Sequence, residues 1–180
     1  MIETFDNVFT ENVQSDIYHL AITANYQIGW DDTAVFEHRQ FPCLHHSLTK
    51  REWGQLDLIS RIQSQQLQDK IKNEKFVSAT INLAVPSSIQ FPHSHNEPLV
   101  LLYYINPEWK NEYYGETLFY DEFAEEVVHT SIYKPGRCVL FDGTIPHSIR
   151  PSSHVAPQYR FTLFVSFTKK NFIEELKNIT

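Results

Sequence analysis

Three histidines and one arginine are the residues of this chain whose type and spacing suit a chemical function. His93 and His95 lie two residues apart, His147 follows 52 residues after His95, and Arg160 opens an apolar run. Side chains two residues apart in a strand point to the same face, so His93 and His95 can approach one metal ion together. With His147 as a third ligand from a distant segment, this order predicts a mononuclear metal site on a β-barrel.

Iron suits such a set of ligands. Neutral imidazole and carboxylate groups bind Fe(II) without filling all of its coordination positions, which leaves room for a chelating cosubstrate and for O2. A zinc cage of thiolates is excluded, because the only two cysteines, Cys43 and Cys138, are far apart in sequence. Glu97 is a nearby candidate carboxylate ligand. Asp142 is a lesser one, because an Asp-Gly dipeptide is typical of a turn.

Two helices are expected to support the site from the N-terminal part of the chain. The first has Thr10 as its candidate N-cap. The second begins at Thr49, because Thr49 and Glu52 have the spacing of a capping box. The apolar faces at helical spacing are Val13, Ile17, Leu20, Ala21 and Ala24 in the first helix, and Trp53, Leu56, Ile59 and Leu67 in the second.

After Lys75 the apolar period changes from helical to two. The odd positions from Val77 to Val85 are all apolar and alternate with polar residues, which predicts a strand with one buried face. Further strands are expected around residues 89–95, 99–106, 116–120, 126–133, 137–142 and 160–168. Many short strands after two helices, joined by Pro and Gly turns, predict a mostly β fold: a double-sheet barrel supported by two N-terminal helices.

The length of 180 residues is sufficient for one domain with a substantial core. We therefore expect a single domain over residues 1–180, with a helical support region at 1–75, a β-barrel core at 76–168 and a short C-terminal helix or tail at 169–180. Specificity is expected in the aromatic segments 26–48 and 107–115, because binding residues concentrate in loops. No pattern in the sequence predicts an oligomeric state.

Charge and hydropathy exclude several classes of partner. The net charge of −7 and the lack of a basic run argue against nucleic acid as a partner. The chain starts without a signal-peptide pattern and has no stretch near the ~20 apolar residues of a membrane span. Together with the two isolated cysteines, this leads to the expectation of a cytoplasmic protein that does not bind a membrane.

Several phrases together resemble a known enzyme family. In order along the chain they are HSHNE, LLYYINPEW, YGETLFYD, KPGRCVLFDGTIPHSIRP and YRFTLFVSF, which span about half of the sequence. They resemble the iron(II)- and 2-oxoglutarate-dependent dioxygenases, in particular the prolyl-4-hydroxylase-like group. The resemblance implies a double-stranded β-helix of jelly-roll or cupin-like type, with Fe(II), 2-oxoglutarate as cosubstrate and O2. It also implies a hydroxylase that acts on a peptidyl, in particular a prolyl, or a small-molecule substrate.

The same resemblance implies roles for single residues. His147 matches the distal histidine ligand of the metal. Arg160 matches the basic residue that binds the distal carboxylate of 2-oxoglutarate, and Tyr104 matches a hydroxyl partner of that carboxylate. A guanidinium suits this role because it binds carboxylates through two parallel hydrogen bonds.

The first pair of ligands departs from the family pattern, which is usually His-x-Asp and less often His-x-Glu. His95 and Glu97 would complete a site of two histidines and one carboxylate. His93 and His95 would instead complete a three-histidine site, which we favour, with Glu97 as the alternative ligand. Two other functions stay open: a cupin-type metal enzyme with three histidines and no 2-oxoglutarate, and a jelly-roll binding module without catalysis.

Overall fold

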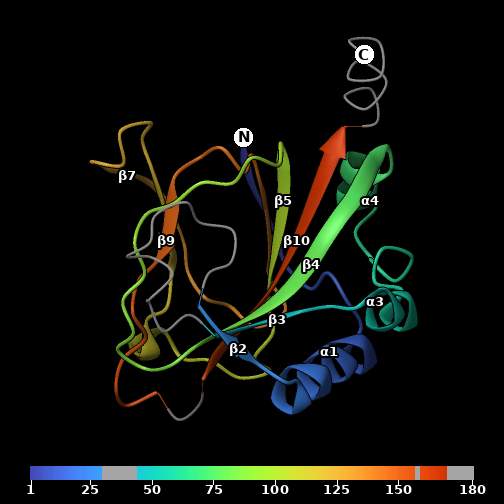
Figure 1. Cartoon of the computed structure of the whole chain (residues 1–180), viewed down its shortest axis with the longest axis horizontal. Helices are drawn as coiled ribbons and strands as arrows, with labels where there is room; N and C mark the ends of the chain where they lie inside the picture. The colour runs from blue at the N-terminus through green and yellow to red at the C-terminus, as the bar shows by residue number, and fades with distance from the viewer. Residues whose placement is uncertain (30–43, 157–158, 170–180) are drawn as a thin grey trace.

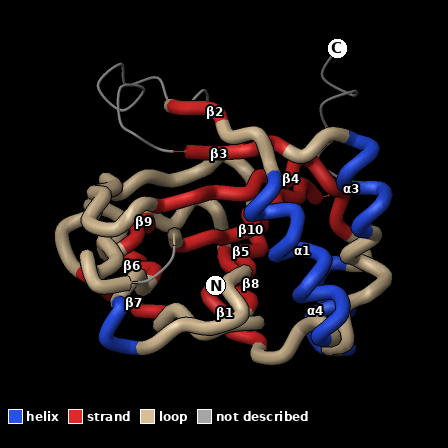
Figure 2. The backbone as a smooth tube through the Cα atoms, turned by 90° about the horizontal axis from the view of Figure 1, so that it is seen from below, coloured by secondary structure: helices blue, strands red, loops and turns tan. Residues whose placement is uncertain are grey.

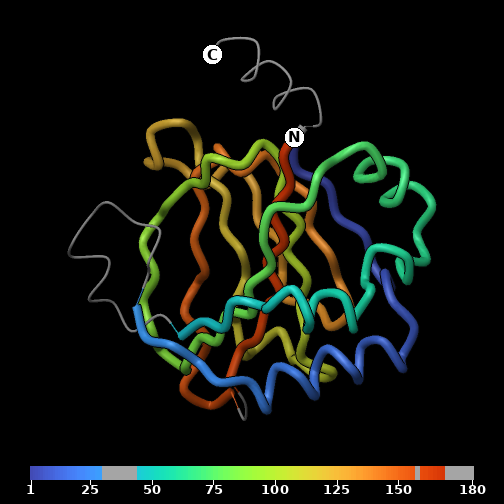
Figure 3. The backbone as a smooth tube through the Cα atoms, turned by 45° about the vertical axis from the view of Figure 1, so that its right-hand side comes forward, coloured from blue at the N-terminus to red at the C-terminus, as the bar shows by residue number. Residues whose placement is uncertain are grey.

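The computed structural model describes residues 1–29, 44–156 and 159–169, and its strands form two antiparallel sheets. The predicted tail beyond Lys169 and most of the aromatic segment 26–48 lie outside these residues. The larger sheet has the strand order β1 (Ile2–Phe5), β8 (Cys138–Phe141), β5 (Leu99–Tyr104), β10 (Arg160–Lys169), β4 (Glu74–Ala84), β3 (Leu44–Ser47) and β2 (Gln27–Ile28). Figure 3 shows β10, in red, running through the middle of the strands.

The smaller sheet has three strands, in the order β7 (Val127–Ser131), β6 (Thr117–Tyr120) and β9 (His147–Ile149). It lies on one side of the larger sheet, and the helices lie on the other (Figures 1 and 2). A single turn of 3-10 helix, η1 (Asn111–Tyr113), precedes β6. The two sheets form the expected double-layered barrel.

Capping residues fix the starts of the helices. Thr10 caps α1 (Glu11–Thr23), as predicted, and accepts a hydrogen bond from the Val13 amide. Thr49 and Glu52 form the predicted capping box at α3 (Lys50–Leu56). The second predicted helix is in fact two helices, because Asp57 adopts the left-handed conformation at φ 43° and ends α3. Leu67 belongs to the separate helix α4 (Gln65–Ile71), whose N-cap is Ser64.

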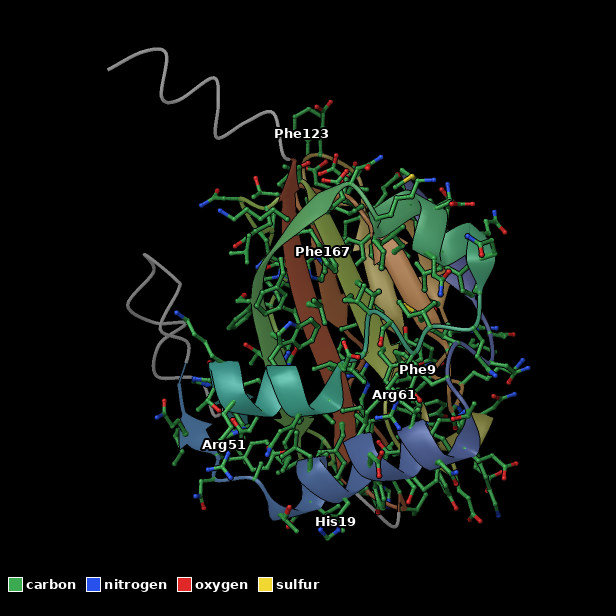
Figure 4. The ribbon with its side chains drawn as sticks, turned by 90° about the vertical axis from the view of Figure 1, so that its right-hand side faces the viewer. Phe9, His19, Arg51, Arg61, Phe123 and Phe167 are labelled. Atoms are coloured by element: carbon green, nitrogen blue, oxygen red, sulfur yellow. The ribbon has the colours of Figure 1, made fainter. Side chains whose placement is uncertain are left out.

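Two apolar cores share the larger sheet. On the helix side, Phe161, Leu163, Val165 and Phe167 of β10 pack with the buried faces of α1 and α4. Figure 4 shows this side, with Phe167 on β10 and with His19 on the outer surface of α1. On the other side lies the barrel-interior cluster, which consists of Val100, Leu102, Tyr104, Phe119, Tyr133, Val139 and Phe141. Arg160 and Phe164 occupy the face of β10 that points to this interior, because residues of equal parity share a face.

Three strand predictions need correction. Residues 89–95 do not form a strand and contribute only an isolated bridge from His93 to His147. The segment around His147, which is not among the predicted strands, forms the short strand β9. Val77 is exposed, because a β-bulge between Ser166 and Phe167 shifts the register so that Phe76 pairs with Phe167. None of the helices that the structure describes has the length and apolar character needed to cross a lipid bilayer.

Candidate metal centre and anion-binding site

The three histidines singled out in the sequence come together at one place in the structure. One ligand nitrogen from each of His93, His95 and His147 lies within 4.8 Å of the others. The ring centroids of His93 and His147 are 4.5 Å apart, and that of His95 is 5.1 Å from each of them. Three imidazoles at these distances can reach one metal ion with small side-chain adjustments.

Backbone hydrogen bonds hold the segments that carry these histidines. His93 and His147 pair through two bonds, with N···O distances of 3.0 and 2.9 Å. The His95 amide donates to the carbonyl of Gly143 at 2.7 Å. Gly143 allows this close approach, because a Cβ at that position would overlap the carbonyl oxygen of Glu97 and press on the His95 side chain.

Two of the imidazoles have a fixed tautomer. Nδ1 of His93 lies 3.1 Å from the Phe91 carbonyl oxygen, and Nδ1 of His147 lies 2.9 Å from that of Ile145. A carbonyl oxygen only accepts hydrogen bonds, so Nδ1 must carry the proton and Nε2 the lone pair. Metal ligands commonly have this arrangement, in which the second nitrogen is anchored to the protein. Burial, with a smaller contribution from His93, holds the pKa of His147 well below its ordinary value, so this ligand stays neutral.

Aromatic rings of the barrel interior pack against the histidines. The His147 ring lies 4.9 Å from that of Phe141 and 6.0 Å from that of Phe119, centroid to centroid. The His95 ring lies 4.6 Å from that of Phe164 on β10. The three histidines therefore border one end of the barrel-interior cluster.

Arg160 borders the same cluster from a different position. It is four residues before Phe164 on the same face of β10, roughly 13 Å away along the strand. Only 1% of its surface is exposed, and its guanidinium carbon lies 4.9 Å from the Tyr133 ring centroid and 5.6 Å from that of Tyr104. The metal-ligand candidates thus border the interior that buries Arg160, with His147 buried and with His93 and His95 half-buried at its edge.

No described carboxylate forms a salt bridge with the Arg160 guanidinium, and Glu116 acts on it only at longer range, where its charge raises the pKa of Arg160. Nε donates to the Gly115 carbonyl at 2.8 Å, and Nη2 donates to Thr117 Oγ1 at 3.3 Å. No described Asp or Glu oxygen lies within salt-bridge distance of it. Burial lowers the pKa of Arg160, but a guanidinium stays protonated in proteins. An unpaired buried charge is costly, so the site favours an anionic ligand.

Tyr104 belongs to the same polar group as Arg160. Its hydroxyl is fully buried and donates to Thr117 Oγ1 at 2.9 Å, with a longer contact of 3.3 Å to the Ser131 carbonyl. Burial raises the pKa of Tyr104, which keeps the phenol protonated as a hydrogen-bond donor. Arg160 and Tyr104, which the family resemblance matches to the distal carboxylate, therefore lie next to each other in the structure.

A clamp of buried polar groups fixes the start of β10. Asn106 Oδ1 accepts from the Phe161 amide at 2.8 Å, and its amide nitrogen donates to the Tyr159 carbonyl at 2.9 Å. The Tyr133 hydroxyl oxygen lies 2.6 Å from both Asn106 Oδ1 and the Phe161 carbonyl oxygen, and these two acceptors share its one proton. Both neighbours of Arg160 are therefore held, which sets the direction of its side chain.

The two carboxylate candidates lie elsewhere. The structure does not bring the Glu97 carboxylate into the group of three histidines, although Glu97 lies in the bend directly after His95. Asp142 acts as a turn residue, because its Oδ1 accepts from the amide and hydroxyl of Thr144. The sequence did not single out Asn106, Thr117, Ser131 or Tyr133. An inward position on a predicted strand was the available signal for the last three, and it does not distinguish a ligand contact from packing.

The comparisons with known proteins concern structure alone. No family model matches the chain, and no curated protein matches its sequence. A prolyl hydroxylase from Trichoplax adhaerens, solved with a peptide fragment of the hypoxia inducible factor oxygen degradation domain, superimposes with a TM-score of 0.65 and 13% identity, covering 94% of this chain and 84% of that chain. A prolyl-4-hydroxylase from Pseudomonas putida gives a TM-score of 0.65 at 14% identity, and the match covers 93% of this chain and 92% of that chain.

HygX from Streptomyces hygroscopicus, solved with nickel and 2-oxoglutarate, has a TM-score of 0.66 at 10% identity. The match covers 94% of this chain and 83% of the HygX chain. The chain has the fold of the 2-oxoglutarate and Fe(II) oxygenases. The predicted double-stranded β-helix with supporting helices is confirmed. At these identities the likeness establishes the fold, and the function has to be argued from the site.

Proposed function

We propose that this protein is an Fe(II)- and 2-oxoglutarate-dependent oxygenase, formed by one domain over residues 1–180. It hydroxylates a peptidyl, in particular a prolyl, or a small-molecule substrate and releases succinate and CO2 as co-products. One observation carries the proposal: a buried guanidinium without a carboxylate partner shares the barrel interior with three clustered histidines. A metal alone would account for the histidines, whereas a buried guanidinium that forms no salt bridge with a described residue favours an anionic ligand beside it.

The three histidines fit Fe(II). His93, His95 and His147 would hold it through neutral imidazole nitrogens, and three protein ligands leave positions open for a chelating cosubstrate and O2. When bound, iron together with 2-oxoglutarate supplies an oxidant for unactivated C–H bonds through oxidative decarboxylation of the cosubstrate. The hydrogen bonds at Nδ1 of His93 and His147 keep their Nε2 atoms directed as ligands. Glu97 is the alternative ligand if the 95–97 bend rearranges.

Arg160 fits the distal carboxylate of 2-oxoglutarate. Two of its five N–H donors have partners among the described residues, which leaves donors for a carboxylate. Tyr104 lies in the same polar group. The neighbouring rings of Tyr104 and Tyr133 are buried and exclude water, which strengthens the attraction between the guanidinium and the bound anion.

The substrate classes are suggested by the structural neighbours and by the loops. Peptide is the ligand named for the Trichoplax enzyme, and hygromycin B is named for a second structure of HygX. The segment 107–115 of this chain is rich in aromatic residues, with Trp109 packed on Tyr133 at 4.7 Å between ring centroids. Such loops around a rigid barrel are where oxygenase specificity is expected.

The test is anaerobic addition of Fe(II) and then 2-oxoglutarate, followed by the visible metal-to-ligand absorption and by the melting temperature. The wild type is expected to bind one iron and then 2-oxoglutarate, with a rise in melting temperature. His147→Ala should lose iron. Arg160→Gln should keep iron and lose at least about 100-fold in affinity for 2-oxoglutarate, because it removes a buried charge contact. Arg51→Gln changes the net charge equally on exposed α3 (Figure 4) and should have no effect.

The alternatives give different outcomes in the same experiment. Iron binding without 2-oxoglutarate binding, unaffected by Arg160→Gln, would support a cupin-type three-histidine enzyme instead. Binding of neither would support a jelly-roll module without catalysis. If Glu97→Ala abolishes iron binding while His93→Ala preserves it, the ligand set is His95, Glu97 and His147.

A further inference from the structure

The small sheet has an open edge at β7. This strand, Val127–Ser131, is the last in the order β7, β6, β9, and β6 is its only strand partner among the described residues. The backbone groups that β7 turns away from β6 are therefore available to a further strand, for which an open edge is a template. Lys and Pro commonly protect such edges, and β7 contains neither.

Apolar side chains are exposed along this edge. A bulge leaves Val128 without a Cα partner on β6, and the exposed fractions of Val127 and Val128 are 50% and 60%. Ile132, directly after the strand, is 45% exposed, and Phe123 in the turn before it is 71% exposed. Figure 4 shows Phe123 at the opposite end of the molecule from His19 of α1. Exposed apolar side chains gathered at one sheet edge favour an interaction site.

The charge beside these apolar residues is negative. Glu122, Glu125 and Glu126 are exposed in the turn between β6 and β7, and none of them forms a salt bridge with a described residue. The segment 121–133 contains no Lys and no Arg that could balance them. The electrostatic complement of this edge is therefore a chain that carries Lys or Arg.

We propose that the β7 edge binds an extended, basic segment of a partner polypeptide, which adds to the small sheet as a further strand. Main-chain hydrogen bonds to β7 hold the segment and its apolar side chains cover the exposed valines. Its Lys or Arg side chains face Glu125 and Glu126. A second copy of this chain is a poorer occupant, because two molecules of net charge −7 would bring the same carboxylates together.

This binding is separate from the proposed function, because no group of the β7 edge belongs to the histidine cluster or to the surroundings of Arg160. The added strand requires neither iron nor 2-oxoglutarate. Its affinity should therefore be the same for the full chain with and without Fe(II).

The test is the fluorescence anisotropy of labelled peptides titrated with the full chain. The first peptide has the core Thr-Val-Thr-Val-Thr between two pairs of Lys, and the second has the same core between two pairs of Glu. The Lys-flanked peptide should bind at least about tenfold more tightly at low salt, and added salt should reduce this advantage. A third peptide keeps the lysines and has Pro at two adjacent core positions. It should lose binding, because Pro cannot donate to a strand ladder.

A charge-reversal variant locates the binding site. Glu125→Lys/Glu126→Lys should bind the Lys-flanked peptide at least about tenfold more weakly than the wild type does, and it should bind the Glu-flanked peptide more tightly. Glu11→Lys/Asp16→Lys is the matched control, since it makes the same change of net charge on exposed positions of α1, far from β7 (Figure 1). The control should bind both peptides like the wild type, and melting curves show whether both variants are folded.

Amide hydrogen exchange followed by NMR shows the added strand directly. The Lys-flanked peptide should slow exchange at the amides of β7 that face away from β6. Equal binding of the Pro-containing peptide would show a nonspecific attraction of positive charge and would overturn the proposal, as would equal losses in the two charge variants. Protection of the same amides by dimerisation without peptide would assign the edge to a second copy and would also overturn it.

Discussion

Two buried tyrosines show how differently one hydroxyl can contribute to stability. Tyr103 and Tyr133 are 0% and 3% exposed. The Tyr133 hydroxyl bonds to Asn106 and to the Phe161 carbonyl, whereas the Tyr103 hydroxyl has no hydrogen-bond partner among the described residues. Tyr103 faces the helix-side core, where its ring packs edge-on against Phe9 at 5.1 Å between centroids. The Tyr103 ring therefore stabilises the folded protein, whereas its buried hydroxyl destabilises it.

We predict that Tyr103→Phe raises the free energy of unfolding by about 1 kcal/mol, because it removes a buried hydroxyl and keeps the ring. Tyr133→Phe should lower the free energy of unfolding by about 2 kcal/mol, since it removes the hydroxyl that accepts from the Asn106 backbone amide and donates within the same group. Urea unfolding followed by circular dichroism measures both. A loss of stability in Tyr103→Phe would mean that the hydroxyl has a bound water as partner.

At the scale of elements, the close contact between two turns decides where His95 lies. The bend after His95 and the turn between β8 and β9 touch at Gly143, where a Cβ would overlap the Glu97 carbonyl. A backbone atom cannot move aside as a flexible side chain can. The bend carrying His95 would therefore have to shift away from the turn that leads to His147.

We predict that Gly143→Ala lowers iron affinity at least tenfold, because a small displacement of one ligand weakens the whole site. Gly54→Ala is the matched control, since a Cβ there meets nothing within 4 Å and alanine favours the helix α3. Iron stoichiometry after dialysis against a weak chelator compares the two. Iron retention in Gly143→Ala equal to that in Gly54→Ala would show that the bend adapts.

The periodicity of the sequence predicted the strands and the helix starts, because both depend on local patterns. The alternation up to Val85 indicated β4, and the capping residues Thr10 and Thr49 indicated two helix starts. The bulge that exposes Val77 depends on the pairing of β4 with β10, which is distant in sequence, so local patterns missed it. The left-handed turn at Asp57 ends α3 within an apolar pattern that continues past it, so the pattern alone did not mark the break. The histidine cluster was predictable because all three members are chemically distinctive. Thr117 and Ser131 were not, because only the folded sheets bring Thr117 into contact with Arg160 and Ser131 opposite Thr117.

At the scale of the whole molecule, one ion-pair group ties the N-terminal strand to the barrel. Asp6 follows β1, and its carboxylate accepts from Arg137 at 2.7 Å and from Lys134 at 2.6 Å. The Arg137 carbonyl in turn accepts from the Tyr104 amide at 2.9 Å. Asp6 thus anchors the edge strand β1 to the loop before β8, next to the strand that carries Tyr104.

This group makes the stability of the molecule depend on pH. The hydrogen bond from Arg137, with help from Lys134, lowers the pKa of Asp6 from 3.8 to about 2. A lowered folded-state pKa stabilises the protein above pH 4, and the contribution disappears as the pH falls toward 2. Because about a third of the Asp6 side chain is exposed, solvent screening reduces the contribution to about 1 kcal/mol.

We therefore predict that Asp6→Asn has a free energy of unfolding about 1 kcal/mol lower than that of the wild type at pH 7. This difference should disappear as the pH falls through about 2. Unfolding by urea at a series of pH values measures this difference directly. Asp16 of α1 forms an exposed ion pair with Arg61 and serves as the comparison. Asp16→Asn should change the free energy of unfolding at pH 7 by less than about 0.5 kcal/mol. A difference for Asp6→Asn that stays constant down to pH 2 would show that packing of the side chain, and not its charge, anchors β1.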